Sequence, residues 1–209
     1  MQRLGARSLP VVSRGDKFLI AQSLGKLAEF LGLNETIKPK LSPDELAARI
    51  DAINRGAQRF ISQIPVERFE DKLRNRDRPY RVLCHHVFRI PEAIVDALSA
   101  GIAVRHESLT QPPPADMKTP AQVVAYGEQV RQKFAAWWRA LPDHSGTKIV
   151  ETYYGPQPMH EVMERASWHT GQHVRQLMML LDGLGIEPNQ RMTAADFEGL
   201  PMPEKVWDE

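Results

Sequence analysis

Two histidines near the C-terminal end of the chain are spaced so that they could bind one metal ion. His169 and His173 stand four residues apart in the segment SWHTGQHVRQLMMLLDGLG, which continues into a strongly apolar run. Residues four apart lie on one face of an α-helix, so two imidazoles at this spacing can direct ring nitrogens at a common point. Both fall on the apolar stripe of the expected helix, where a buried polar group needs a partner. The pair therefore predicts either a metal site or two core histidines that are hydrogen bonded.

Another expected helix supplies further candidate ligands. The segment LCHHVFRI places His86 on an apolar stripe with Leu83 and Ile90, whereas His85 is rotated toward the flank. The spacing favours His86 as the third ligand, and His85 is the alternative. Three histidines from two helices would leave at least one coordination position of a divalent ion for water or substrate, as in catalytic sites. Gln176, on the same stripe as the C-terminal pair, is placed to orient a ligand.

Four long amphipathic helices must position these residues. Apolar residues recur at spacings of three and four over residues 43–64, 79–100, 120–141 and 159–184. Ser42 and Thr119 are expected to cap the first and third of these helices, and each is followed by a proline suited to the first helical position. Pro91 inside the second helix predicts a kink. Four helices of about 20 residues predict a mainly α protein built as a four-helix bundle.

The N-terminal residues have a different character. Residues 9–13 and 17–21 are typical of two strands joined by a tight turn at Arg14, Gly15 and Asp16, and a short helix is expected over residues 23–31. A hairpin with one helix buries too little surface to fold alone. We therefore expect it to pack on the rest of the chain or on a second copy, and we predict a homodimer. The expected units are a segment over 1–38, a helical domain over 41–188 and an irregular tail over 189–209.

Composition excludes several functional classes. The formal net charge of +1 gives no electrostatic reason to expect nucleic acid or an anionic membrane as a partner. Cys84 is the only cysteine, so neither an internal disulfide nor a Cys-x-x-Cys site is possible. The sequence contains no apolar run near the ~18 residues of a membrane span and no secretory segment at its start. We expect a cytoplasmic protein.

The motifs around the histidines resemble those of the DinB-like superfamily of metal-binding four-helix bundles, over about residues 41–186. Those proteins share a histidine on the second helix, H-x-x-x-H on the last helix and a glutamine three residues further on. The resemblance implies His86, His169 and His173 as ligands of a divalent ion, zinc or nickel, and Gln176 as the trailing glutamine. The last motif reads T-G-Q-H-V where H-H-R-G-Q is common, and the second-helix histidine is doubled, which leaves the choice between His85 and His86 open.

The segment SLPVV, with the hairpin and helix that follow it, resembles the second half of a glutaredoxin. This resemblance implies that Leu9 and Pro10 contact a thiol substrate. The half that carries the active-site cysteine has no counterpart, so thiol–disulfide exchange is not expected. One hypothesis is that Met1 is an internal start within a longer reading frame that encodes a complete glutaredoxin domain.

Two functional hypotheses follow. Characterised branches of the DinB-like superfamily include thiol-dependent transferases and isomerases, and others are assigned as hydrolases. The resemblance thus implies a metal-dependent enzyme that acts on a small molecule, with a low-molecular-weight thiol such as glutathione as partner. The alternative is a non-catalytic metal-binding or dimerising scaffold, because the sequence shows no clear general base beside the three histidines.

Overall fold

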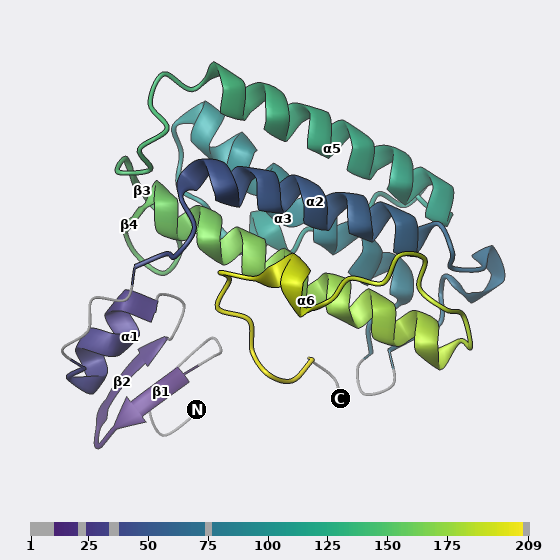
Figure 1. The fold of residues 1–209 in the computed structure, drawn as a ribbon, viewed down its shortest axis with the longest axis horizontal. Coiled ribbons are helices and arrows are strands. Elements are labelled where there is room, and N and C mark those ends of the chain that lie inside the picture. The colour runs from purple at the N-terminus through teal and green to yellow at the C-terminus, as the bar shows by residue number, and fades with distance from the viewer. Residues whose placement is uncertain (1–10, 21–23, 34–37, 74–76, 207–209) are drawn as a thin grey trace.

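Four long helices lie side by side in the computed structural model, which describes residues 11–20, 24–33, 38–73 and 77–206 (Figure 1). The helices are α2 (Pro43–Ile61), α3 (Tyr80–Ala100), α5 (Pro120–Ala140) and α6 (Met159–Gly183). Helix α2 packs against α5 and α6, and α3 packs against the same two helices. The mainly α fold that the sequence predicts is confirmed.

Local sequence signals set the helix ends. The Ser42 hydroxyl accepts a hydrogen bond from the Glu45 backbone N–H at 3.3 Å, and the Glu45 carboxylate accepts one from the Ser42 N–H at 2.7 Å. Thr119 and Gln122 form the equivalent reciprocal cap at the start of α5. These pairs satisfy backbone donors that the first helical turn leaves open. Pro91 lies inside α3, and the helix continues through it.

The core is one apolar cluster between the four helices. Each long helix contributes the stripe of residues that recurs every three or four positions, and most of these side chains are almost fully buried. Burial of this apolar surface is the main force that holds the helices together. The largest fully buried side chains are Phe60, Phe69, Phe88, Leu46, Ile50, Ile53, Ile61, Leu83, Ile90, Met163, Leu177 and Leu181.

Short elements join the long helices. Two 3-10 helices, η2 (Val66–Arg68) and η3 (Ala194–Phe197), follow α2 and α6, and the short helix α4 (His106–Leu109) lies between α3 and α5. Strands β3 (Ile149–Val150) and β4 (Gln157–Pro158) pair antiparallel immediately before α6. Helix α4 has only four residues, so the apolar periodicity of the sequence did not predict it.

The N-terminal unit consists of strands β1 (Val11–Arg14) and β2 (Lys17–Ile20) and helix α1 (Leu24–Leu31), as predicted. Arg14 pairs with Lys17, so the turn is formed by Gly15 and Asp16, and Gly15 has a φ of +62°. The Lys26 ammonium group donates a hydrogen bond to the Pro156 carbonyl oxygen at 3.4 Å, which joins α1 to the turn before β4. Leu9 and Pro10 lie outside the described residues. In the described ranges, no helix has both the length and the apolar character of a membrane span.

Candidate metal centre

Three histidines from two helices meet inside the bundle. His86 projects from α3, and His169 and His173 project from α6, so that one possible ligand nitrogen from each lies within 4.8 Å of the other two. The ring centroid of His173 is 4.8 Å from that of His86 and 4.9 Å from that of His169. In the described part of the chain, no Asp, Glu or Cys belongs to this group. The three histidines that the sequence singled out on two different helices thus lie close together.

A hydrogen bond fixes the orientation of the His173 ring. Nδ1 of His173 lies 2.6 Å from Oε1 of Gln176. Because an amide oxygen only accepts, Nδ1 carries the proton and Nε2 keeps its lone pair. The backbone of Leu109, at the end of α4, raises the pKa of His86 against the larger, opposite effect of burial. A ligand histidine that bonds through its second nitrogen to a fixed acceptor is typical of metal sites.

The surroundings keep the cluster in the form that binds cations. Burial lowers the pKa of His86 to about 3, with a further contribution from the Arg78 guanidinium. Burial also lowers the pKa values of His169 and His173 well below their usual range. All three rings are therefore neutral at pH 7, and only a neutral imidazole nitrogen has a lone pair for a metal ion.

His85, the alternative ligand, lies elsewhere. Its ring stacks on Tyr126 of α5 with a centroid distance of 4.9 Å and an interplanar angle of 15°. The hydroxyl of Tyr126 in turn donates a hydrogen bond to the carboxylate of Glu92. His85 thus faces α5, whereas His86 faces α6, as expected for adjacent residues about 100° apart around a helix.

The arrangement of the three histidines fits a divalent ion. Zinc–nitrogen bonds of ~2.0–2.1 Å require ring nitrogens roughly 3.3 Å apart in a tetrahedral site. The ligand atoms of the cluster lie within 4.8 Å of one another, so shifts of about 1 Å would complete such a site. The neutral rings and the proton on Nδ1 of His173 are what coordination requires. The cluster could therefore hold a metal ion.

An arginine stands one helical turn before His169. The Arg165 guanidinium donates a hydrogen bond to the Tyr153 hydroxyl at 3.1 Å, and its central carbon lies 5.1 Å from the ring centroid of Tyr154. It also lies 5.9 Å from the ring centroid of Trp168. Arg165 and His169 are four residues apart and therefore lie on one face of α6. This spacing is visible in the sequence, but the search for metal ligands considered only histidines and did not single out Arg165.

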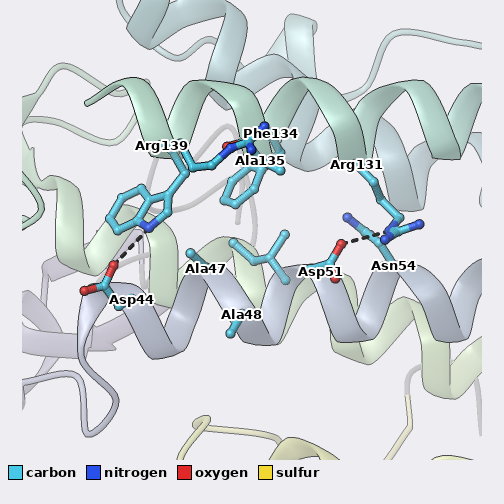
Figure 2. A pocket seen from close by; sticks show the side chains of 11 residues that line it. Asp44, Ala47, Ala48, Asp51, Asn54, Arg131, Phe134, Ala135 and Arg139 are labelled. Carbon is cyan, nitrogen blue, oxygen red and sulfur yellow. Dashed lines mark hydrogen bonds and ion pairs between the residues drawn. The ribbon is translucent and has the colours of Figure 1, made fainter. Parts of the chain in front are cut away.

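A separate cavity of about 260 Å³ lies between α2 and α5 (Figure 2). Trp138 donates to Asp44 near one end, and Arg131 pairs with Asp51 near the other. Asn54 also lines it; this side chain is fully buried, and neither of its carboxamide atoms has a hydrogen-bond partner within the described ranges. The clustered histidines do not line this cavity, so it is distinct from the candidate metal centre.

Comparisons with known proteins give a likeness to solved structures but none to a protein-family model. No protein-family model matches the sequence, and a search of curated proteins finds no significant match. Among solved structures, the crystal structure of the mycothiol-dependent maleylpyruvate isomerase is similar, with a TM-score of 0.45 and 16% sequence identity. The match covers 66% of this chain and 61% of that enzyme's chain, so this chain corresponds to less than two thirds of its length.

Proposed function

We propose that the chain is a divalent-metal-dependent enzyme that acts on a small molecule. His86, His169 and His173 would hold the ion, and Gln176 would orient His173. The observation that carries this proposal is the convergence of three neutral histidines from α3 and α6 in the interior of the bundle. Buried imidazoles without such a purpose would be costly, since each must give up its contact with water.

The arrangement favours a catalytic role over a closed structural site. Structural zinc sites normally use four protein ligands, whereas catalytic sites use three and leave a position open. His169 is partly buried whereas His86 and His173 are buried, so we place the open position of the ion on the His169 side. A divalent ion bound there would act as a Lewis acid and lower the pKa of a water or thiol that reaches its open position.

The reaction we propose is thiol-dependent transfer or isomerisation, with hydrolysis of a small molecule as the alternative chemistry. The support is the resemblance of the CHHVF and HTGQHVRQL motifs to the DinB-like superfamily, together with the glutaredoxin-like segment that contains Leu9 and Pro10. Zinc or nickel is the proposed ion and a thiol such as glutathione the proposed partner. A cytoplasmic homodimer is the proposed form.

A non-catalytic scaffold is the second candidate. It is favoured by one observation: in the described part of the chain, no carboxylate joins the histidines as a general base. A scaffold would bind the ion for stability and would not turn over substrate.

An activity assay separates the two candidates. Protein stripped with a chelator and reloaded with zinc or nickel would be tested for conjugation of glutathione to a chromogenic electrophile, and in parallel for hydrolysis of a chromogenic ester. We expect turnover that requires the ion and is lost in His173→Ala. Metal binding without any metal-dependent turnover in either assay would favour the scaffold.

A further inference from the structure

A buried carboxamide in the wall of the cavity between α2 and α5 has no hydrogen-bond partner in the described part of the chain (Figure 2). Asn54 is 0% exposed, and neither its Nδ2 nor its Oδ1 bonds to any described residue. Such a group is costly, because it has given up its hydrogen bonds to water and received none in return. Asn54 therefore offers N–H donors and an acceptor oxygen at the cavity wall.

The rest of the buried lining is apolar. Asn54 shares one face of α2 with Ile50, four residues before it, and α5 contributes Phe134 and Trp138 from the other side. These three apolar side chains are buried. The remaining apolar lining consists of residues with no side-chain atom beyond Cβ to fill the space between the helices: Ala47, Ala48 and Ala135. The cavity thus combines an apolar surface with one unsatisfied polar group, a combination typical of small-molecule sites.

The charged side chains that line the cavity are balanced, because there are two aspartates and two arginines. Arg131 donates a hydrogen bond to the Asp51 carboxylate at 2.9 Å. The Asp44 carboxylate accepts one from the indole N–H of Trp138 at 3.0 Å, and Arg139 is exposed. A charged ligand would meet no excess of the opposite charge to offset its loss of hydration. The lining therefore favours an uncharged molecule.

We propose that this cavity is a ligand-binding site for a small uncharged molecule that combines an apolar ring with a carboxamide. The ligand's carboxamide and that of Asn54 would form a pair of N–H···O hydrogen bonds, since each group has both a donor and an acceptor. A cavity of ~150 Å³ is large enough for benzene, so about 260 Å³ accommodates one ring with this substituent. The inference goes beyond the proposed function, because the clustered histidines do not line the cavity.

Binding of benzamide to the full-length protein tests the inference. The protein would be labelled with ¹⁵N and titrated in an NMR experiment, with the indole N–H of Trp138 as the reporter. Toluene, which lacks the carboxamide, and benzoate, which is charged, are the reference ligands. We expect benzoate to bind at least about tenfold more weakly than benzamide, because its charge would lose hydration without a matching partner.

Two variants separate the contribution of Asn54 from that of the cavity. Asn54→Leu has a side chain of similar size without hydrogen-bonding groups, and it should weaken benzamide binding at least about tenfold while toluene binding changes by no more than about twofold. Ala135→Leu should fill the cavity and abolish binding of both compounds. Ala136→Leu is the matched control, because Ala136 is exposed on α5 but does not line the cavity.

Each outcome decides for or against the inference. Weaker binding of benzamide to Asn54→Leu and Ala135→Leu, but not to Ala136→Leu, supports it. Equal binding of benzamide by Asn54→Leu and wild type overturns it, as does binding of toluene or benzoate but not of benzamide. No binding of benzamide up to its solubility limit also overturns it, since water would then be the partner of Asn54.

The test does not depend on the proposed function. The titration needs no metal and no turnover, so the cavity site and the metal-dependent activity can fail separately. Circular dichroism verifies that each variant folds. If Asn54→Leu does not fold, Ala135→Leu still decides the matter, because it changes an exposed position and benzamide binding that survives it would overturn the inference.

Discussion

At the scale of single residues, the candidate site depends on the state and orientation of a few buried side chains. His173 is oriented by a hydrogen bond to Gln176. This contact follows from helical spacing and was expected from the sequence.

Loss of the Gln176 amide should weaken metal binding. In Gln176→Leu the Nδ1–H of His173 has no acceptor at that position, so the ring is free to turn and its proton can move to Nε2. We expect metal affinity to fall by about 10- to 100-fold, as measured by competition with a chromophoric chelator. Gln172→Leu is the matched control, because Gln172 is also buried on α6 but donates to the Lys205 carbonyl. Equal affinities for Gln176→Leu and wild type would remove Gln176 from the site.

Glu164 should make stability depend on pH. Burial, with a contribution from Glu161, raises the pKa of Glu164 from 4.5 to about 7. Between these values the folded protein holds a proton that the unfolded chain has released, so the free energy of unfolding decreases as pH rises from 4.5 through 7. Solvent reaches this side chain, so the effect should be about 1 kcal/mol.

The measurement is urea unfolding of wild type and Glu164→Gln at pH 5 and pH 8. From pH 5 to pH 8, the free energy of unfolding of the wild type should fall by about 1 kcal/mol more than that of the variant. Parallel losses in the two proteins would show that Glu164 titrates normally.

At the scale of helices, close packing of α5 on α3 occurs at one glycine. A Cβ atom at Gly127 would lie 2.5 Å from Cζ of Phe88, which is fully buried. Gly127→Ala should therefore force the ring or the helix to shift and cost about 2 kcal/mol. At Gly183 an added Cβ would meet nothing within 4 Å, so Gly183→Ala should be neutral or stabilise by up to ~1 kcal/mol. Urea unfolding of both variants measures these changes in stability. Equal changes for Gly127→Ala and Gly183→Ala would contradict the close contact between Gly127 and Phe88.

Helix positions were predictable from the sequence, but their contacts were not. The caps at Ser42 and Thr119 and the apolar stripes are local signals, and they gave the four long helices within a few residues. The contact between Gly127 and Phe88 depends on how α3 and α5 are placed in three dimensions. The choice between His85 and His86 was only favoured by spacing, and it is the position of α6 relative to α3 that brings His86 to the cluster.

At the scale of the whole molecule, the C-terminal segment is part of the packed structure. The sequence predicts an irregular tail, and within the described residues its helical part is the short η3. Met192, Phe197 and Leu200 are nevertheless buried. Arg175 of α6 donates hydrogen bonds to the Pro203 and Glu204 carbonyls, which ties the segment to the bundle. Scattered apolar residues without periodicity gave no sign of this burial.

Truncation of Phe197 should therefore destabilise the bundle. Phe197→Ala removes a ring that is 7% exposed and lies against Gly171 of α6. We expect a loss of about 3 kcal/mol and a lower midpoint in thermal denaturation. Val66→Ala is the control, because Val66 is 58% exposed and should change stability by no more than about 0.5 kcal/mol. A midpoint for Phe197→Ala equal to that of wild type would show that the tail does not contribute to the fold.

The central claim is that His86, His169 and His173 share one divalent ion. The most direct test is elemental analysis of purified protein after zinc loading and dialysis, for wild type and for the His86→Ala, His169→Ala, His173→Ala and His85→Ala variants. We predict about one ion per chain in wild type and His85→Ala, and loss of the ion in the other three. A wild type without bound metal, or an ion that remains when His169 or His173 is replaced, would contradict the claim.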